Sequence, residues 1–144
     1  MTNTHRFETI ETAKAYALAG NATLTLESLA TGAHFTFKVR QAKDKESGEP
    51  TPGVFFVSLL NGQDNESDYM YLGLIRNGSF GLTKGSRAGK EAASVRAFEF
   101  FFRSITLHPQ LVVRHEGRCG RCGRTLTVPE SIDAGIGPEC ATKM

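Results

Sequence analysis

The chain has 144 residues, of which 40% are hydrophobic and 22% charged, and its formal net charge is +2 at pH 7. This composition is typical of a soluble globular protein, and it contains no apolar run long enough to span a membrane. The net charge is too small to indicate nucleic-acid binding by itself. Three cysteines without a signal-peptide pattern favour reduced thiols and a cytoplasmic setting.

The first part of the chain predicts a helix followed by a hairpin. Residues 9–19 begin with Thr9 as a capping residue, carry apolar residues at helical spacing, and are followed by Gly20. Residues 22–27 and 35–39 alternate apolar and polar side chains, which is the period of a strand. These two strands are expected to pair antiparallel.

The middle of the chain predicts the centre of a sheet. Residues 42–53 are rich in charge, glycine and proline, and predict a mobile loop. Residues 54–60 form a nearly unbroken apolar run, which is typical of a strand covered on both faces. Residues 69–75 predict the next strand, and the Asn-Gly pair that follows is a hairpin signal into residues 79–83. The pattern as a whole predicts an antiparallel meander of about five strands.

A second helix is predicted over residues 91–105. Its apolar residues recur every three or four positions and form one stripe, which consists of Val95, Phe98, Phe101, Phe102 and Ile105. Phe100 falls off this stripe. We expect the stripe to fill the core rather than to stack on bases, because base-stacking side chains lie exposed on sheets or loops. A basic face, which we interpret as solvated, consists of Lys84, Arg87, Lys90, Arg96 and Arg103.

All three cysteines lie near the C-terminus. Cys119 and Cys122 form a Cys-x-x-Cys pair with a glycine after each cysteine, and Cys140 follows later. Glycine allows the tight turn that aims backbone amides at thiolates, so the pattern indicates a metal knuckle. Structural Zn²⁺ is tetrahedral, and the nearest fourth ligand is His115, with His108 as the alternative. The sequence therefore predicts a Zn²⁺ site made of His115, Cys119, Cys122 and Cys140.

Other interpretations of the cysteines are a disulfide, a redox dithiol, unrelated thiols or a catalytic zinc site. The odd cysteine count opposes a disulfide framework, and a redox motif would lie in a βαβ unit. Catalytic zinc would need an open coordination position and a poised carboxylate, and we interpret Glu116 and Glu139 as solvated charges instead. Pro138 suits the start of a short helix carrying Cys140. We therefore expect an α+β body, residues 1–107, and a small lobe, residues 108–144, similar to a zinc ribbon or treble clef.

The chain resembles a family of small uncharacterised proteins found mainly in phages and prophages. The resemblance spans most of the chain, and it rests on these segments: Gly20-Asn-Ala-Thr-Leu-Thr-Leu, Phe35-Thr-Phe-Lys-Val-Arg, Ser67-Asp-Tyr-Met-Tyr-Leu-Gly, Ser94-Val-Arg-Ala-Phe-Glu-Phe, His115-Glu-Gly-Arg-Cys-Gly-Arg-Cys-Gly-Arg, Pro129-Glu-Ser-Ile and Gly137-Pro-Glu-Cys. The last three segments are the most specific, because they match the metal-knuckle pattern of the family. That match implies His115, rather than His108, as the fourth ligand. The resemblance implies no enzyme activity.

The leading functional hypothesis is a non-catalytic phage protein that binds a host protein. Small zinc-containing phage proteins that inhibit RNA-guided CRISPR nucleases exist, and this chain is similar to them in size, charge distribution and expected metal content. By that analogy the partner is a CRISPR effector nuclease and the protein an anti-CRISPR, with the acidic segment 44–68 imitating phosphates or docking on a basic surface. The resemblance to phage proteins implies that the protein acts in the cytoplasm of a bacterial host cell, and neither a membrane nor a small-molecule substrate is expected.

Two further hypotheses remain. The first is direct nucleic-acid binding by arginines at and around the knuckle, which are Arg114, Arg118, Arg121 and Arg124. The second is a zinc hydrolase or nuclease, which would require a metal with an exchangeable water.

Overall fold

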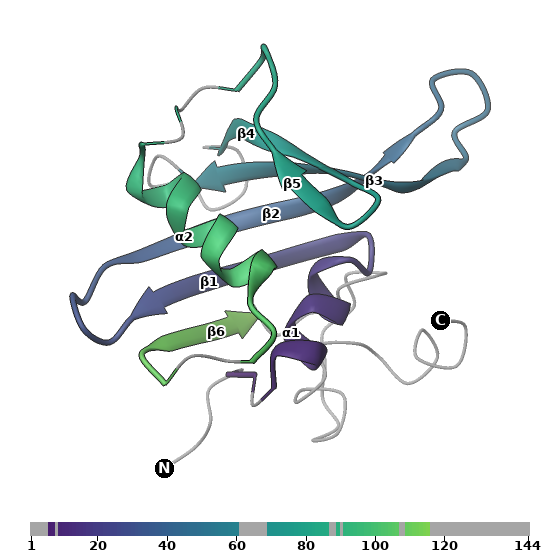
Figure 1. Ribbon diagram of the computed structural model, residues 1–144. Helices are drawn as coiled ribbons and strands as arrows, with labels where there is room; N and C mark the ends of the chain where they lie inside the picture. The colour runs from purple at the N-terminus through teal and green to yellow at the C-terminus, as the bar shows by residue number, and fades with distance from the viewer. Residues whose placement is uncertain are drawn as a thin grey trace.

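The computed structural model describes residues 6–7, 9–60, 69–86, 89, 91–106 and 109–115. In chain order the elements are α1 (Ile10–Ala17), β1 (Asn21–Ser28), β2 (His34–Lys43), β3 (Pro50–Leu60), β4 (Tyr69–Arg76), β5 (Ser79–Gly81), α2 (Ala93–Arg103) and β6 (Leu111–His115), as Figure 1 shows. The protein is therefore α+β, as the sequence predicts.

The six strands form one antiparallel sheet in the order β5-β4-β3-β2-β1-β6. The predicted meander is confirmed for β1 to β5, and β3 lies in the interior of the sheet as expected. After α2 the chain returns to the opposite edge, where Leu111 to His115 pair with Ser28 to Leu24. The first residues of the segment that we assigned to the C-terminal lobe are thus an edge strand of the body. The remainder of the predicted lobe, residues 116–144, lies outside the described residues.

Helix α1 begins where the sequence predicts. The Thr9 side chain accepts a hydrogen bond of 3.2 Å from the backbone N–H of Thr12, which is the capping contact expected of a threonine at this position. The helix ends at Ala17, earlier than the predicted end at residue 19. Gly20 then takes a φ of +119°, in the region that only glycine adopts readily, and leads the chain into β1.

The segment between β2 and β3 is more regular than predicted. Strand pairing extends to Lys43 opposite Pro50, so the connecting turn is shorter than the expected loop over residues 42–53. Backbone N–H groups of Ser47 and Glu46 donate hydrogen bonds of 3.0 and 2.8 Å to the Asp44 carboxylate. These bonds stabilise the ionised form and lower the pKa of Asp44. Local hydrogen bonding, which composition does not reveal, orders this turn.

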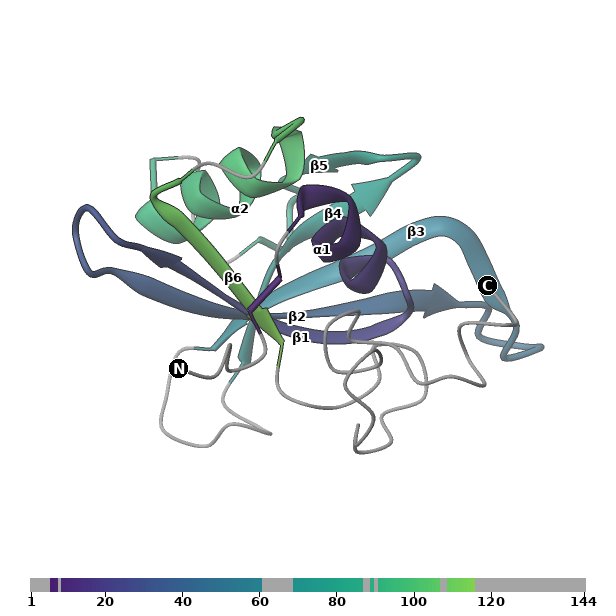
Figure 2. The same ribbon diagram turned by 90° about the horizontal axis from the view of Figure 1, so that it is seen from below.

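Both helices lie on one face of the curved sheet (Figure 2), and the main core lies between the helices and the sheet. Phe98 of α2 is at its centre. The Phe98 ring lies 4.8 Å from that of Phe80 and 5.1 Å from that of Phe37, and it also contacts Phe101 and Phe102 at 5.8 and 5.9 Å. The predicted role of these phenylalanines in the core is confirmed. Among the described residues, no helix has the length and apolar character needed to cross a bilayer.

Three exposed apolar side chains refine the sequence predictions. Phe56 in β3 is 45% exposed, whereas its neighbours Phe55 and Val57 are buried. The prediction that β3 is covered on both faces is therefore wrong at this position. Ile105, which we assigned to the buried stripe, is 86% exposed because α2 ends before it, at Arg103. Phe100 is 50% exposed, as expected for a residue off the stripe.

Candidate functional site

His115, the proposed metal ligand of the body, is the last residue of β6. Its side chain is 5% exposed and shares the helix-covered face of the sheet with Leu24, its partner in β1. The imidazole ring lies 5.2 Å from the ring of Phe7 and 5.5 Å from that of Tyr16, centre to centre. The structure thus gives His115 a packing role that the sequence did not predict.

Tyr16 connects this aromatic cluster to the sheet. Its hydroxyl donates a hydrogen bond of 2.8 Å to the carbonyl oxygen of Thr23 and accepts one of 2.9 Å from the N–H of the same residue. Thr23 lies one position before Leu24, which is the first β1 residue paired with β6 and lies opposite the last residue of that strand, His115. The hydroxyl therefore satisfies the backbone of β1 at the point where the neighbouring strand ends. These two hydrogen bonds hold the ring of Tyr16, which α1 contributes to the aromatic cluster around His115.

The three predicted thiolate ligands, Cys119, Cys122 and Cys140, lie outside the described residues. Within the described ranges, no three histidine, cysteine or acidic side chains form a group able to hold a metal ion. His115 is thus the one member of the predicted set whose surroundings are known. Imidazole and thiolate are ligands that suit Zn²⁺, and a ring held by packing is oriented before the metal binds. The donor types therefore fit a structural zinc site, and the ligand set stays a prediction.

Arg114, the residue before His115, points to the other face of the sheet. Its guanidinium Nη1 forms a salt bridge with the Glu27 carboxylate, and the two side chains are 37% and 32% exposed. A guanidinium engaged in this way is less available to a phosphate. The other three arginines of the nucleic-acid hypothesis, Arg118, Arg121 and Arg124, lie outside the described residues.

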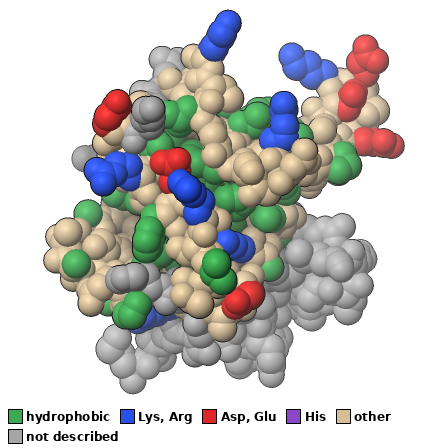
Figure 3. All heavy atoms as spheres, in the orientation of Figure 1, with side chains coloured by type: hydrophobic (Ala, Val, Ile, Leu, Met, Phe, Trp, Pro, Cys, Tyr) green, Lys and Arg blue, Asp and Glu red, His purple; other side chains and the backbone are tan. Residues whose placement is uncertain are grey.

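A groove that the sequence did not predict runs between α2 and the turn connecting β1 to β2. Its volume is about 940 Å³, and its described lining is mostly apolar. The lining residues are Ser28, Ala30, Thr31, Ala33, Phe35, Ala93, Arg96, Ala97, Glu99, Phe100, Arg103, Ser104, Gln110 and Leu111. Figure 3 shows apolar side chains exposed on this side of the molecule, with lysine and arginine side chains among them. Alanines on both walls leave the groove open.

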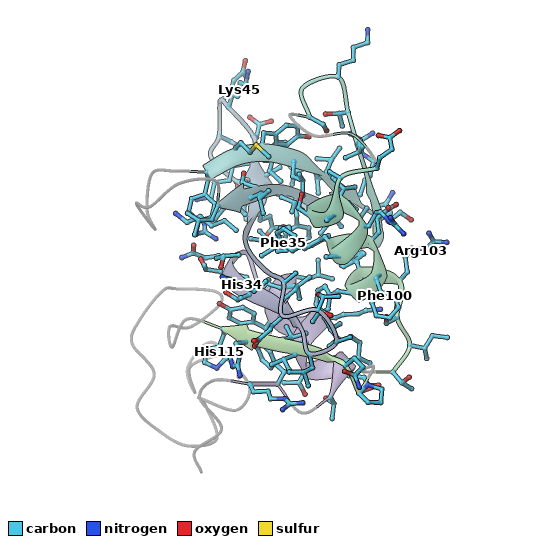
Figure 4. The ribbon with its side chains drawn as sticks, turned by 90° about the vertical axis from the view of Figure 1, so that its left-hand side faces the viewer. His34, Phe35, Lys45, Phe100, Arg103 and His115 are labelled. Carbon is cyan, nitrogen blue, oxygen red and sulfur yellow. The ribbon has the colours of Figure 1, made fainter. Side chains whose placement is uncertain are left out.

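Charged side chains border the groove on the α2 side. Arg96, Glu99 and Arg103 lie at helical spacing, with Phe100 between them. Figure 4 shows Phe100 and Arg103 on α2 at the right of the view, and Phe35 on the sheet to the left of the helix. The position of Phe100 off the buried stripe was the one sequence signal for this groove. The partner wall, from β1 and β2, could not be identified without the strand pairing.

A protein-family model matches residues 109–144. The model is described as a family of unknown function, DUF6011. Comparison with curated proteins and with solved structures gives no match.

The matched segment contains β6, His115 and the three cysteines. It confirms the resemblance to an uncharacterised family for this part of the chain, whereas the resemblance that we described covers most of the chain. The phage setting and the metal motif stay predictions.

Proposed function

We propose that the protein is a non-catalytic binding protein whose C-terminal segment holds one structural Zn²⁺ through His115, Cys119, Cys122 and Cys140. The observation that carries this proposal is the location of His115, which is packed at the end of an edge strand, four residues before the Cys-x-x-Cys pair. One ligand on a rigid strand would connect the metal to the body of the protein. When bound, the ion closes a tetrahedral shell and contributes folding energy to a segment with few apolar residues.

Metal content tests the ligand set. We expect about one zinc per chain by elemental analysis, the ratio of a single four-ligand site. Cys122→Ser should lose most of the metal. His115→Phe is more informative than an alanine substitution, because a phenyl ring preserves packing against Phe7 and Tyr16 but has no nitrogen. His34→Ala, at an exposed position in β2, is the matched control and should retain the metal.

The two histidine variants separate ligation from packing. If His115→Phe keeps full zinc content and stability, His115 is a packing residue and the fourth ligand is another group. If zinc is lost while far-UV circular dichroism of the body is unchanged, ligation is supported. A wild-type chain that binds no zinc, yet unfolds cooperatively, would refute the metal proposal.

We further propose that the partner is a host protein, and specifically a CRISPR effector nuclease, so that the protein acts as an anti-CRISPR. The resemblance to phage proteins supports this choice, as does the acidic character of segment 44–68. The test is affinity purification from a bacterial host carrying such a nuclease, combined with a target-cleavage assay. We expect capture of the nuclease and loss of cleavage at micromolar protein, and the absence of both effects rejects this partner.

Direct nucleic-acid binding is the competing outcome of the same experiment. Contacts with phosphates release counterions, so the affinity for DNA or RNA would fall steeply with salt. The salt bridge between Arg114 and Glu27 does not favour this alternative. A salt-dependent affinity for DNA or RNA without nuclease present would nevertheless replace the proposed protein partner.

A further inference from the structure

The groove beside α2 exposes apolar surface that the body does not use for its own core. Phe100 is 50% exposed on one wall, and Phe35, packed at the edge of the core, lies on the other. Alanine side chains between them, such as Ala97 and Ala33, leave room for an inserted side chain. An exposed apolar surface beside a groove is a common feature of protein-binding sites.

The charges at the groove are available to a ligand. The side chains of Arg96, Glu99 and Arg103 form no hydrogen bond or ion pair with any described residue. Two arginines against one glutamate make the described rim basic. Arginine binds carboxylates through two parallel hydrogen bonds, so the rim is complementary to acidic side chains.

The spacing of the two arginines limits the shape of the ligand. Arg96 and Arg103 are seven residues apart on α2, which corresponds to about 10 Å along the helix axis at 1.5 Å per residue. A peptide in the extended polyproline II conformation covers about 9 Å in three residues, at about 3.1 Å each, and its three residues per turn place residues i and i+3 on the same side. Two acidic residues three positions apart could therefore each face one arginine. The two residues between them lie opposite Phe100.

We propose that this groove binds an extended acidic peptide segment of a partner protein, with a bulky apolar side chain inserted between Phe35 and Phe100. Carboxylates on either side of that side chain contact Arg96 and Arg103. The inference rests on the proposed function as a protein-binding protein, and it identifies the surface and the chemistry of the recognised segment. Glu99, between the two arginines, disfavours a phosphate backbone but tolerates a peptide whose carboxylates are spaced around it.

The test uses the full-length zinc-loaded protein and a fluorescein-labelled peptide in which two glutamates flank a Phe-Leu pair. Binding is followed by fluorescence anisotropy at low salt. Arg103→Glu should weaken binding more than tenfold, because it removes a charge-assisted contact and adds a repulsive one. Arg76→Glu, at an exposed arginine of β4 outside the groove, is the matched control and should change affinity less than about twofold.

A charge exchange makes the test specific. A peptide with lysine in place of the glutamate that faces Arg103 should bind the Arg103→Glu variant better than it binds the wild-type protein. Phe100→Ala should weaken the original peptide about tenfold, because the buried ring contact is lost. Equal affinities for the original and exchanged peptides in both proteins would overturn the proposal, since they would show that the glutamate does not face Arg103.

Other occupants give distinct results. Binding of a short labelled oligothymidylate that Phe100→Ala abolishes, without peptide binding, identifies a nucleic-acid surface and overturns the proposal. A dimer in sedimentation experiments that Arg103→Glu dissociates identifies a second copy of the chain, with the same consequence. Failure of the groove and failure of the proposed function are distinguishable, because zinc content and nuclease capture are measured on the same wild-type protein. Capture without peptide binding rejects the groove alone.

Discussion

Tyr16→Phe is the substitution for which the structure gives the most definite expectation. The change removes one oxygen atom and leaves the aromatic ring, so packing against Phe7 and His115 is preserved. The lost hydroxyl forms hydrogen bonds with both the N–H and the carbonyl oxygen of Thr23. Thr23 has no partner in β6, because that strand ends opposite the next residue, Leu24. The variant therefore tests one physical claim, namely that a side chain substitutes for strand pairing at this edge.

The magnitude follows from burial. Tyr16 is 1% exposed and Thr23 is 6% exposed, so water has little access to the two backbone groups. A buried polar group left without a partner costs roughly 1–3 kcal/mol, and two such groups, partly relaxed, should reduce the free energy of unfolding by about 2–4 kcal/mol. This is a large part of the roughly 5–15 kcal/mol typical of a domain. The melting temperature should fall by roughly 5–15 °C.

The assay is urea unfolding followed by far-UV circular dichroism, with Tyr71→Phe as the control. The Tyr71 hydroxyl also has a hydrogen bond, of 3.0 Å to Thr83 Oγ1, but that contact lies at the surface. Its loss should cost less than about 0.5 kcal/mol, as for most surface changes. Equal losses in the two variants would refute the argument from burial. Zinc content should be unchanged in Tyr16→Phe, because the ring that packs on His115 remains.

Further predictions concern the core, the sheet edge and the β2–β3 turn. Phe98→Ala should cost about 3–5 kcal/mol in urea unfolding, because the side chain is fully buried among aromatic rings. Gly73→Ala should cost about 1–3 kcal/mol, since its Cβ would lie 2.7 Å from the carbonyl oxygen of Gly81 and 2.8 Å from Phe80 Cε1; an unchanged melting temperature would contradict this contact. Because hydrogen bonds lower the pKa of Asp44, its contribution to stability is present above the ordinary pKa of a carboxyl group and is lost as the pH falls through the lowered value. The protection factors of amides in this turn, which are exchange rates corrected for the intrinsic rate at each pH, should therefore fall at acidic pH in the wild type, whereas Asp44→Ala should show the lower protection already at neutral pH.

Periodicity of the sequence predicted most of the body. Alternation in β1 and β2, the Asn-Gly turn after β4 and the phenylalanine stripe of α2 are local patterns, and the corresponding elements form where expected. Element ends were less accurate. Strand pairing continued β2 to Lys43 through the polar segment, and α2 ended before Ile105. In both cases a tertiary or local hydrogen bond, rather than residue type, determines the boundary.

For the candidate sites, the sequence by itself determined which chemical groups are present: an imidazole and three thiols at a spacing that predicts a zinc site, and a phenylalanine that falls off the buried stripe of its helix. Only the tertiary structure decided that β6 joins the sheet beside β1, that His115 packs against Phe7 and Tyr16, and that Phe100 faces a groove. The physical reason is that these contacts join residues far apart in the chain. A local pattern reveals which face of an element is apolar, whereas the packing of the whole chain determines what that face contacts.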